Sequence, residues 1–284
     1  MFQWSSVCGA RPAVMGIVNV TPDSFSDGGR FLAPEAATEH GLALVAAGAD
    51  LLDVGGESTR PGAEPVDATE EIRRVGPVVE LLAAQAGVPI SIDTTKAAVA
   101  AAALAAGATI VNDVSAGRFD PAILDVTSAG GAGYVAMHLQ GEPRTMQDAP
   151  SYGDVVVDVG DLLAERLDAA RGAGIADAAL CADPGIGFGK TLDHNLALLA
   201  RLPELVARVG VPVLVGTSRK RFLGAILRGV AGETGEPPPE RRDEASLATA
   251  VWALDHGASI VRAHDVRPVA RAIALLEAIR GAAA

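Results

Sequence analysis

The sequence contains few of the residues on which disulfide frameworks and zinc sites depend. Its two cysteines, Cys8 and Cys181, stand too far apart for a metal-binding or redox motif. Its five histidines form no H-x-H or H-E-x-x-H pair, which argues against a zinc hydrolase. The uncharged, alanine-rich stretch 97–111 is shorter than the roughly 20 residues of a membrane-spanning helix. No export signal is recognised at the start, so we expect a soluble, cytoplasmic protein with no membrane partner.

Basic residues are outnumbered by acidic ones, and lysine is scarce among them. The chain has 23 Lys and Arg against 35 Asp and Glu, which gives a formal net charge of −12. Nucleic acid and anionic membranes would repel such a protein, so neither is expected as its main partner. Lys96, Lys190 and Lys220 are the three lysines, against 20 arginines. A lysine at a functional site of this chain would therefore suggest a need for a compact ammonium group.

Short apolar, β-branched segments recur along the 284 residues, and each ends in polar residues. Continuous apolar character is typical of strands that are buried on both faces of a parallel sheet. The predicted strands cover residues 13–20, 50–55, 89–93, 109–114, 133–138, 179–183, 211–217 and 259–264. Segments with helical periodicity lie between them, at 34–47, 68–86, 96–106, 121–129, 155–172, 193–209, 219–229 with 243–256, and 269–279.

Eight successive strand–helix units predict an α/β protein, a (β/α)₈ TIM barrel formed by residues 1–284 as a single domain. The alternative is a doubly wound sheet, which usually has fewer strands and a glycine-rich phosphate motif after the first one. The sequence TPDSF at 21–25 follows the first predicted strand and contains no such motif. Residues 1–12 are expected to form a short lead-in hairpin that closes the bottom of the barrel.

Polar side chains follow the predicted strands at their carboxyl ends, where this fold places its active sites. One interpretation is that strand ends are polar simply because they meet water. The residue types argue otherwise, because amides and carboxylates lie on one arc and cations on another. The amides and carboxylates are Asn19, Asp53, Asp93, Asn112, Asp113 and Asp183. The cations are Arg60, Arg219, Lys220, Arg262 and His264, and we expect them to converge on one rim.

These side chains predict the chemistry of the substrate. The arginine fork matches phosphate oxygens, so the cations indicate an anionic group such as phosphate or pyrophosphate. Asn19 would provide an oxygen ligand for a Mg²⁺ that substrate phosphates also hold, unless it is only a turn residue. Asp93, Asn112 and Asp183 would suit a flat heterocycle with N–H donors, such as an amino-pyrimidinone.

Two features near the rim allow more than one interpretation. Lys220 could be a Schiff-base nucleophile, as in aldolases, but a hydrogen-bonding role is favoured. The segment PGIGFGKT at 184–191 resembles a Walker loop, yet Pro184 occupies the place of its first glycine. We interpret this segment as a flexible, glycine-rich loop in which Lys190 has no assigned role. Lys96 is interpreted as the start of a helix.

Motifs spread in order over nearly the whole chain resemble those of the dihydropteroate synthase family. The two longest are VMGIVNVTPDSFSDGG at 14–29 and DVGGESTRPG at 53–62. The others are SIDT at 91–94, ND at 112–113, MHLQG at 137–141, PRTMQ at 143–147, DPGIGFGK at 183–190, SRK at 218–220 and RAHDV at 262–266.

The resemblance implies a TIM-barrel transferase of folate biosynthesis. It would join 6-hydroxymethyl-7,8-dihydropterin diphosphate to 4-aminobenzoate, giving 7,8-dihydropteroate and pyrophosphate, with Mg²⁺ as cofactor, as a sulfonamide target and as a homodimer. By resemblance, the pterin is held by Asp93, Asn112, Met137, Asp183 and Lys220. The diphosphate is assigned to Thr59, Arg60, Arg262 and His264, the 4-aminobenzoate to Phe188, Ser218 and Lys220, and the metal to Asn19. Mobile loops at 21–29 and 58–62, with Thr21, Asp23, Phe25, Ser58 and Pro61, would close over the site.

The charges favour a dissociative, SN1-like displacement in which Asp93, Lys220, Arg262 and His264 are the catalytic residues. Two alternatives share the barrel and its Asp/Asn/Asp arc. A pterin-binding methyltransferase would transfer a methyl group to a corrinoid, but it would not need the TPDSF or SRK motifs. A catalytically idle paralogue would bind a pterin without turnover.

Overall fold

The computed structural model describes residues 1–21, 34–58, 64–142, 144–230 and 235–282. Within these ranges, eight parallel strands form one sheet in the order β6-β5-β4-β3-β2-β1-β8-β7. The strands are β1 (Ala13–Asn19), β2 (Leu51–Gly55), β3 (Ile90–Asp93), β4 (Ile110–Asp113), β5 (Gly133–Met137), β6 (Leu180–Asp183), β7 (Leu214–Val215) and β8 (Ile260–Ala263). Ala182 and Val213 form a parallel bridge between the outermost strands, so the sheet closes on itself. The predicted (β/α)₈ barrel is confirmed.

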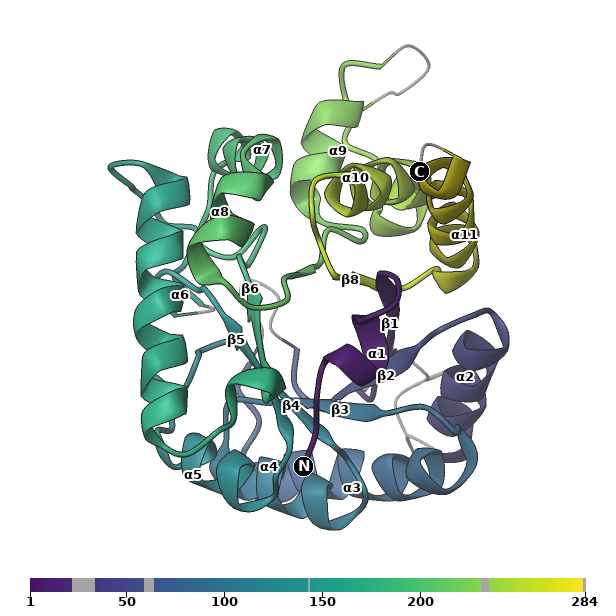
Figure 1. The fold of residues 1–284 in the computed structure, drawn as a ribbon, viewed down its shortest axis with the longest axis vertical. Helices are drawn as coiled ribbons and strands as arrows, with labels where there is room; N and C mark the ends of the chain where they lie inside the picture. The colour runs from purple at the N-terminus through teal and green to yellow at the C-terminus, as the bar shows by residue number, and fades with distance from the viewer. Residues whose placement is uncertain (22–33, 59–63, 143, 231–234, 283–284) are drawn as a thin grey trace.

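The helices form a ring around the strands, as Figure 1 shows. The ring contains α2 (Pro34–Ala46), α3 (Ala68–Gln85), α4 (Ala97–Ala105), α5 (Ala122–Ala129), α6 (Val155–Gly172), α7 (Leu192–Ala200), α8 (Leu202–Val209), α9 (Arg221–Leu227), α10 (Asp243–Asp255) and α11 (Val266–Ala282). The main apolar core lies between this ring and the barrel. No helix of the described ranges is both long and apolar enough to cross a bilayer.

The bounds of the predicted strands and helices agree with the structure to within three residues, except in two places. The segment predicted as one helix at 193–209 is divided at Arg201, where α7 ends and α8 begins. Pro203 lies in the first turn of α8, a position that suits proline, whereas in a helix interior its ring clashes with the preceding turn and a hydrogen bond is lost. The predicted strand at 211–217 is reduced to Leu214–Val215. Val213 lies outside it, forms the closing bridge with Ala182 and accepts a bond from the Ile260 backbone N–H at 3.1 Å.

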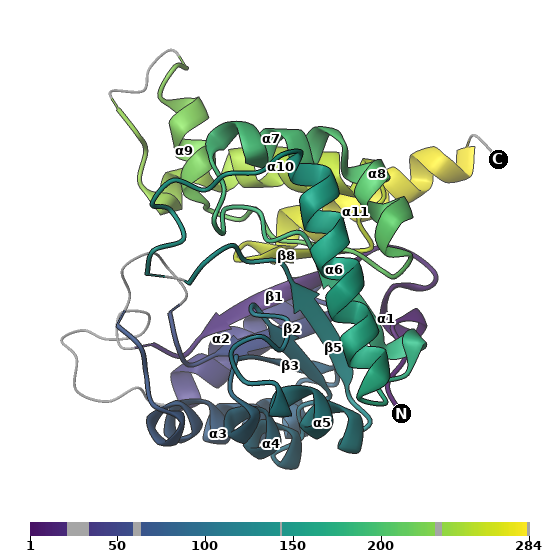
Figure 2. The same ribbon diagram turned by 90° about the vertical axis from the view of Figure 1, so that its left-hand side faces the viewer.

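The chain start forms a one-turn helix, α1 (Ser5–Cys8), so the predicted lead-in hairpin is wrong. The backbone N–H groups of Cys8 and Gly9 bond to carbonyls four residues earlier, and this local bonding replaces a hairpin ladder. Trp4 is 1% exposed and packs with Met15 and Ile260 in a cluster inside the barrel. Figure 2 shows α1 at the end away from the arrowhead of β1, so the lead-in does lie at the bottom.

Trp4 is expected to contribute much of the stability of the barrel bottom. Its indole Nε1 donates to the carbonyl of Ala179 at 2.9 Å. Trp4→Ala should lower the free energy of unfolding by about 3–5 kcal/mol, because it removes a large buried ring and leaves a cavity. Trp4→Phe keeps an aromatic ring and should cost less. Urea unfolding of both variants tests this, and equal losses would contradict a packing role.

Candidate active site

The carboxyl ends of the strands bring the predicted polar residues to one level of the barrel. The parallel register pairs Asp93 of β3 with Gly55 of β2 and with Asn112 of β4. Met137 of β5 pairs with Asp183 of β6. Asn19 ends β1, and Arg262 lies one residue before the end of β8. Side chains that are far apart in sequence therefore meet at this rim.

Arg262 and two carboxylates form the centre of the site. The Arg262 Nε donates to Asp53 Oδ2 at 2.6 Å, and its Nη2 donates to Asp93 Oδ2 at 3.0 Å. Asn112 Nδ2 donates to the same Asp53 oxygen at 2.9 Å. Asp53 is completely buried within β2. The side chains of four strands are thus joined in one hydrogen-bonded cluster.

Asp53 was expected at a strand end, without a specific role. In the structure it accepts bonds from both Arg262 and Asn112. A signal for it was present, because Asp53 lies within the apolar segment LLDVG. A carboxylate in a buried strand is costly unless it is paired. That rule alone would have indicated a cationic or amide partner.

Burial shifts the pKa values of three charged groups at this rim. Burial and the neighbouring Asp53 raise the pKa of Asp93 to about 7, although Arg262 opposes the shift. Burial also raises the pKa of the Asp183 carboxyl. It lowers the pKa of Lys220 to about 8, although Asp183 favours the charged ammonium. Both carboxyls are therefore less acidic, and the lysine less basic, than they would be in water.

Three polar oxygens at the core of the site bond to no other described residue. They are Asp53 Oδ1, Ser91 Oγ and Asn112 Oδ1, and all are buried. A buried polar atom without a partner costs about 1–3 kcal/mol. Such oxygens fit a ligand that brings N–H donors to this depth of the barrel.

Lys220 and Phe188 face each other across the rim. The Lys220 Nζ lies 4.6 Å from the centroid of the Phe188 ring and donates to the carbonyl of Ile186. Phe188 packs against a small apolar cluster that includes Met137. Phe188, which the resemblance assigns to 4-aminobenzoate, is therefore a neighbour of Lys220 and Met137, which it assigns to the pterin.

Ser218 and His264 are also joined. The Ser218 Oγ lies 2.9 Å from His264 Nδ1, and the His264 backbone N–H donates to the same hydroxyl at 3.2 Å. Both residues follow the ends of neighbouring strands, β7 and β8. This pair fixes the His264 imidazole two residues after Arg262, and its place in an anion site stays a prediction.

Arg219 does not join the other cations, so its predicted convergence on the rim is wrong. Its Nε and Nη2 donate to the two carboxylate oxygens of Asp243 at 2.7 and 2.9 Å. Arg219 has a φ of +60°, a left-handed conformation that is uncommon for residues other than glycine. The adjacent side chain of Lys220 instead contacts Ile186 and Phe188.

Several predicted residues lie outside the described ranges. They are Asp23, Phe25, Thr59, Arg60 and Pro61. Thr21 and Ser58 are described and follow β1 and β2 closely.

Glu57, which lies just after β2, accepts a bond from the Val66 backbone N–H at 2.8 Å. Lys96 pairs with Glu57 and Glu71 at 2.6 Å each, and it therefore does more than start a helix.

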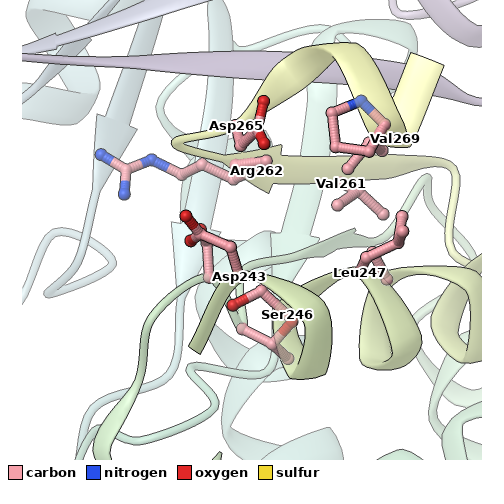
Figure 3. A pocket seen from close by; sticks show the side chains of 12 residues that line it. Asp243, Ser246, Leu247, Val261, Arg262, Asp265 and Val269 are labelled. Atoms are coloured by element: carbon pink, nitrogen blue, oxygen red, sulfur yellow. The ribbon is translucent and has the colours of Figure 1, made fainter. Parts of the chain in front are cut away.

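A small cavity lies behind the rim, between β7, β8 and α10 (Figure 3). Its volume of about 10 Å³ is at the lower limit for one water molecule, so it cannot take a pterin. Ser246, Val261 and Val269 are among the residues that line it. Figure 3 shows the Arg262 guanidinium extending away from these side chains. The Arg262 guanidinium instead lies on the barrel side of β8, where it bonds to Asp53 and Asp93.

Comparison with known proteins identifies the family. A model of the pterin binding enzyme family matches residues 15–264. The dihydropteroate synthase of Mycobacterium leprae is 54% identical over 257 residues, which are 89% of this chain and 88% of the relative. The enzyme of Synechocystis is 44% identical over 279 residues, or 98% and 92% of the two chains. This chain belongs to the dihydropteroate synthase family.

Solved structures of dihydropteroate synthases have the same fold. The enzyme of Xanthomonas albilineans with 4-aminobenzoic acid aligns with a TM-score of 0.86 at 50% identity, and the alignment covers 95% of this chain and 93% of that one. The same species' enzyme with 7,8-dihydropteroate aligns with a TM-score of 0.83 at 47% identity, covering 95% and 94%. The chain is therefore a transferase with the dihydropteroate synthase barrel.

Asp93 should make the stability of the protein depend on pH. A carboxyl with a raised pKa in the folded state stabilises the fold while it is protonated, and this contribution is lost as pH rises from about 4 to about 7. The difference in free energy of unfolding between wild type and Asp93→Asn should therefore fall by on the order of 2 kcal/mol from pH 5 to pH 8. Urea unfolding at both pH values measures this, and a difference that is independent of pH would contradict it.

Proposed function

We propose that this chain condenses 6-hydroxymethyl-7,8-dihydropterin diphosphate with 4-aminobenzoate, giving 7,8-dihydropteroate and pyrophosphate. Family membership supports the reaction class. The single observation that carries the substrate assignment is the cluster of Asp53, Asp93 and Asn112 beside the cation Arg262, in which Asp53 and Asn112 each have a buried oxygen without a partner. Acceptors for a heterocycle and a cation for its diphosphate then stand within one site.

The pterin would occupy the interior end of the site. Asp93, Asn112 and Asp183 would accept its N–H groups, and Lys220 would donate to it. Met137, which is buried at the end of β5, would pack against the ring. Carboxylate and amide groups read the donor pattern of an amino-pyrimidinone much as they read a base edge.

The diphosphate would bind on the outer side of the pterin. Arg262 and His264 would contact its oxygens, with Thr59 and Arg60 contributing from the segment that follows β2. As the bond between the pterin methylene carbon and the diphosphate oxygen breaks, the electron pair leaves with pyrophosphate. Cationic side chains stabilise the charge that grows on this leaving group. Arginine suits the task because its planar fork binds phosphate oxygens in pairs.

The 4-aminobenzoate would approach over Phe188, with Ser218 and Lys220 at its pocket. Its neutral amine nitrogen would form a bond to the methylene carbon and then lose a proton. The positive charge on the pterin would be favoured by Asp93 and Asp183, so no side-chain nucleophile is needed. Closure of the loops that contain Thr21, Asp23, Phe25, Ser58 and Pro61 would keep water from the cation.

Mg²⁺ would be held by Asn19 together with phosphate oxygens of the substrate. In the described part of the chain, no three His, Cys, Asp or Glu side chains gather closely enough to hold a metal ion. Asn19 ends β1 and supplies a single amide oxygen. That sparse donor set fits Mg²⁺, which keeps several waters and is usually shared with substrate phosphates. When bound, the ion would offset the negative charge of the diphosphate.

A cytoplasmic homodimer that pairs through outer helices is part of the proposal. Apolar side chains on two of these helices are exposed, namely Trp252 on α10 and Leu275 and Ile279 on α11. A second copy of the chain could cover them. Their helices lie outside the barrel, so the rim would stay open to substrates in the dimer.

Pyrophosphate release tests the proposed reaction. The expected release requires both the pterin diphosphate and 4-aminobenzoate, and 7,8-dihydropteroate forms in equal amount. Pterin binding without release would instead identify an idle paralogue, and methyl transfer to a corrinoid would identify a methyltransferase. Covalent trapping of Lys220 by borohydride with a carbonyl substrate would support the aldolase interpretation.

Lys220→Arg should impair turnover although it keeps the positive charge. The Lys220 Nζ donates to the Ile186 carbonyl and lies over the Phe188 ring, and a larger, planar guanidinium would not keep both contacts. Displacing the cation by about 1 Å can cost on the order of 10²-fold in rate, which is the loss expected in kcat/KM. Steady-state kinetics test this, with thermal unfolding as a check on folding. Near-normal turnover would contradict a need for a compact ammonium group.

A further inference from the structure

Lys190 is a buried lysine that the proposed reaction does not use. Its side chain lies at the end of the segment 184–190, which connects β6 to α7, and the residue is 3% exposed. It forms no salt bridge with a carboxylate of the described residues. Instead its Nζ lies 2.9 Å from His138 Nδ1 and donates to the Phe188 carbonyl at 3.0 Å. A buried ammonium that makes no salt bridge is costly, although the charge of Asp183 favours it.

His138 is also 3% exposed, and its backbone N–H donates to the carbonyl of Asp183 at 2.9 Å. Burial, together with the charge of Lys190, lowers the pKa of His138 to about 2. The imidazole is therefore neutral near pH 7, and with its proton on Nε2 it can accept from Lys190 at Nδ1. Burial also lowers the pKa of Lys190.

The segment 184–190 is fixed by bonds to its carbonyl groups, so its interpretation as a flexible loop is not supported. The Ile186 carbonyl accepts from Lys220, that of Gly187 from Gln147 and that of Gly189 from Tyr152. A Cβ at Gly185 would lie 1.9 Å from the His138 carbonyl oxygen. The segment therefore packs directly against the chain that follows β5. Within the segment, the carbonyl of Phe188 accepts its bond from Lys190.

We propose that Lys190 and His138 form a buried positioning pair that fixes the backbone of Phe188 and, through its ring, the 4-aminobenzoate pocket beside Lys220. The inference rests on the proposed function, because it takes Phe188 as part of that pocket. Neither member of the pair touches the reacting atoms. Their effect on the reaction passes through the Phe188 carbonyl and ring.

The variants Lys190→Met and His138→Leu each break the pair. Both should raise the KM for 4-aminobenzoate about tenfold, which corresponds to the loss of one hydrogen bond. The KM for the pterin diphosphate should change less than about threefold by the same reasoning, because neither Lys190 nor His138 bonds through its side chain to Asp93, Asn112 or Asp183. His138→Asn places an amide oxygen near the position of Nδ1, and it should restore a KM within about twofold of wild type.

Tyr152→Phe is the matched control. It removes a 2.7 Å bond to the carbonyl of Gly189, one residue after Phe188, and leaves Lys190 in place. If the carbonyl of Phe188 is the one that matters, this control should raise the KM for 4-aminobenzoate less than about twofold. An effect as large as that of Lys190→Met would overturn the proposal, because any bond to the segment would then serve equally.

A double-mutant cycle tests the route of the effect. If Lys190 acts through Phe188, then Phe188→Ala with Lys190→Met should be no worse than Phe188→Ala alone. Multiplying losses would overturn the proposal, as would an unchanged KM in Lys190→Met or failure of His138→Asn to restore it.

Hydrogen exchange of the backbone in 185–190 gives a readout that needs no turnover. Exchange should be faster in Lys190→Met and His138→Leu than in wild type, and unchanged in His138→Asn. Equal exchange in all four proteins would overturn the positioning role. A wild-type protein that releases no pyrophosphate would refute the proposed function instead, and the exchange result would still decide whether the pair fixes Phe188.

Discussion

The site depends on the contact of one partly buried cation, Arg262, with two carboxylates. Arg262 reaches from β8 to Asp53 on β2 and Asp93 on β3, so it crosses β1 to join strands that are not its neighbours. Without it, two carboxylates would lie close together in a nonpolar barrel, where like charges and burial both oppose ionisation. The raised pKa of Asp93 shows that the balance is only partial. The charges of Arg262 and the two carboxylates are therefore only partly balanced. A proton or a bound ligand can change how these groups pair.

The cations at the rim are unusual in a chain with this acidic composition. In a chain of net charge −12, cations at the rim are a local exception. Arg219 is not part of that exception, because Asp243 neutralises it. Lys220 and Arg262 instead share the rim with Asp93 and Asp183, whose charges act on both. A site that contains both positive and negative side chains suits the proposed substrate, because its diphosphate is anionic and the adjacent methylene carbon would become cationic.

The sequence predicted the barrel because apolar strands with polar ends leave a clear periodic pattern. It also brought Asp93, Asn112, Asp183 and Arg262 to one rim, because parallel strands end on the same side. It could not predict the direction of Arg219, which depends on a left-handed backbone conformation and on a carboxylate 24 residues further along the chain. The contact of Lys190 with His138 spans 52 residues and has no local signal at all. Long-range pairing of side chains is the part that the pattern of residues does not contain.

The partners of Arg262 explain how one arginine could serve two stages of the proposed reaction. In the structure two of its five N–H groups, on Nε and Nη2, donate to Asp53 and Asp93. A diphosphate beside it would compete for the same guanidinium, and an arginine that turned to the phosphate would leave the carboxylates with less neutralising charge. That change would come as the pterin methylene gains positive charge. The carboxylates would then interact with this charge in place of Arg262. Because the interior has a lower dielectric constant than water, both interactions are stronger there than at the surface. The ion pairs of the free site are thus suited to be exchanged for ion pairs with the reacting substrate.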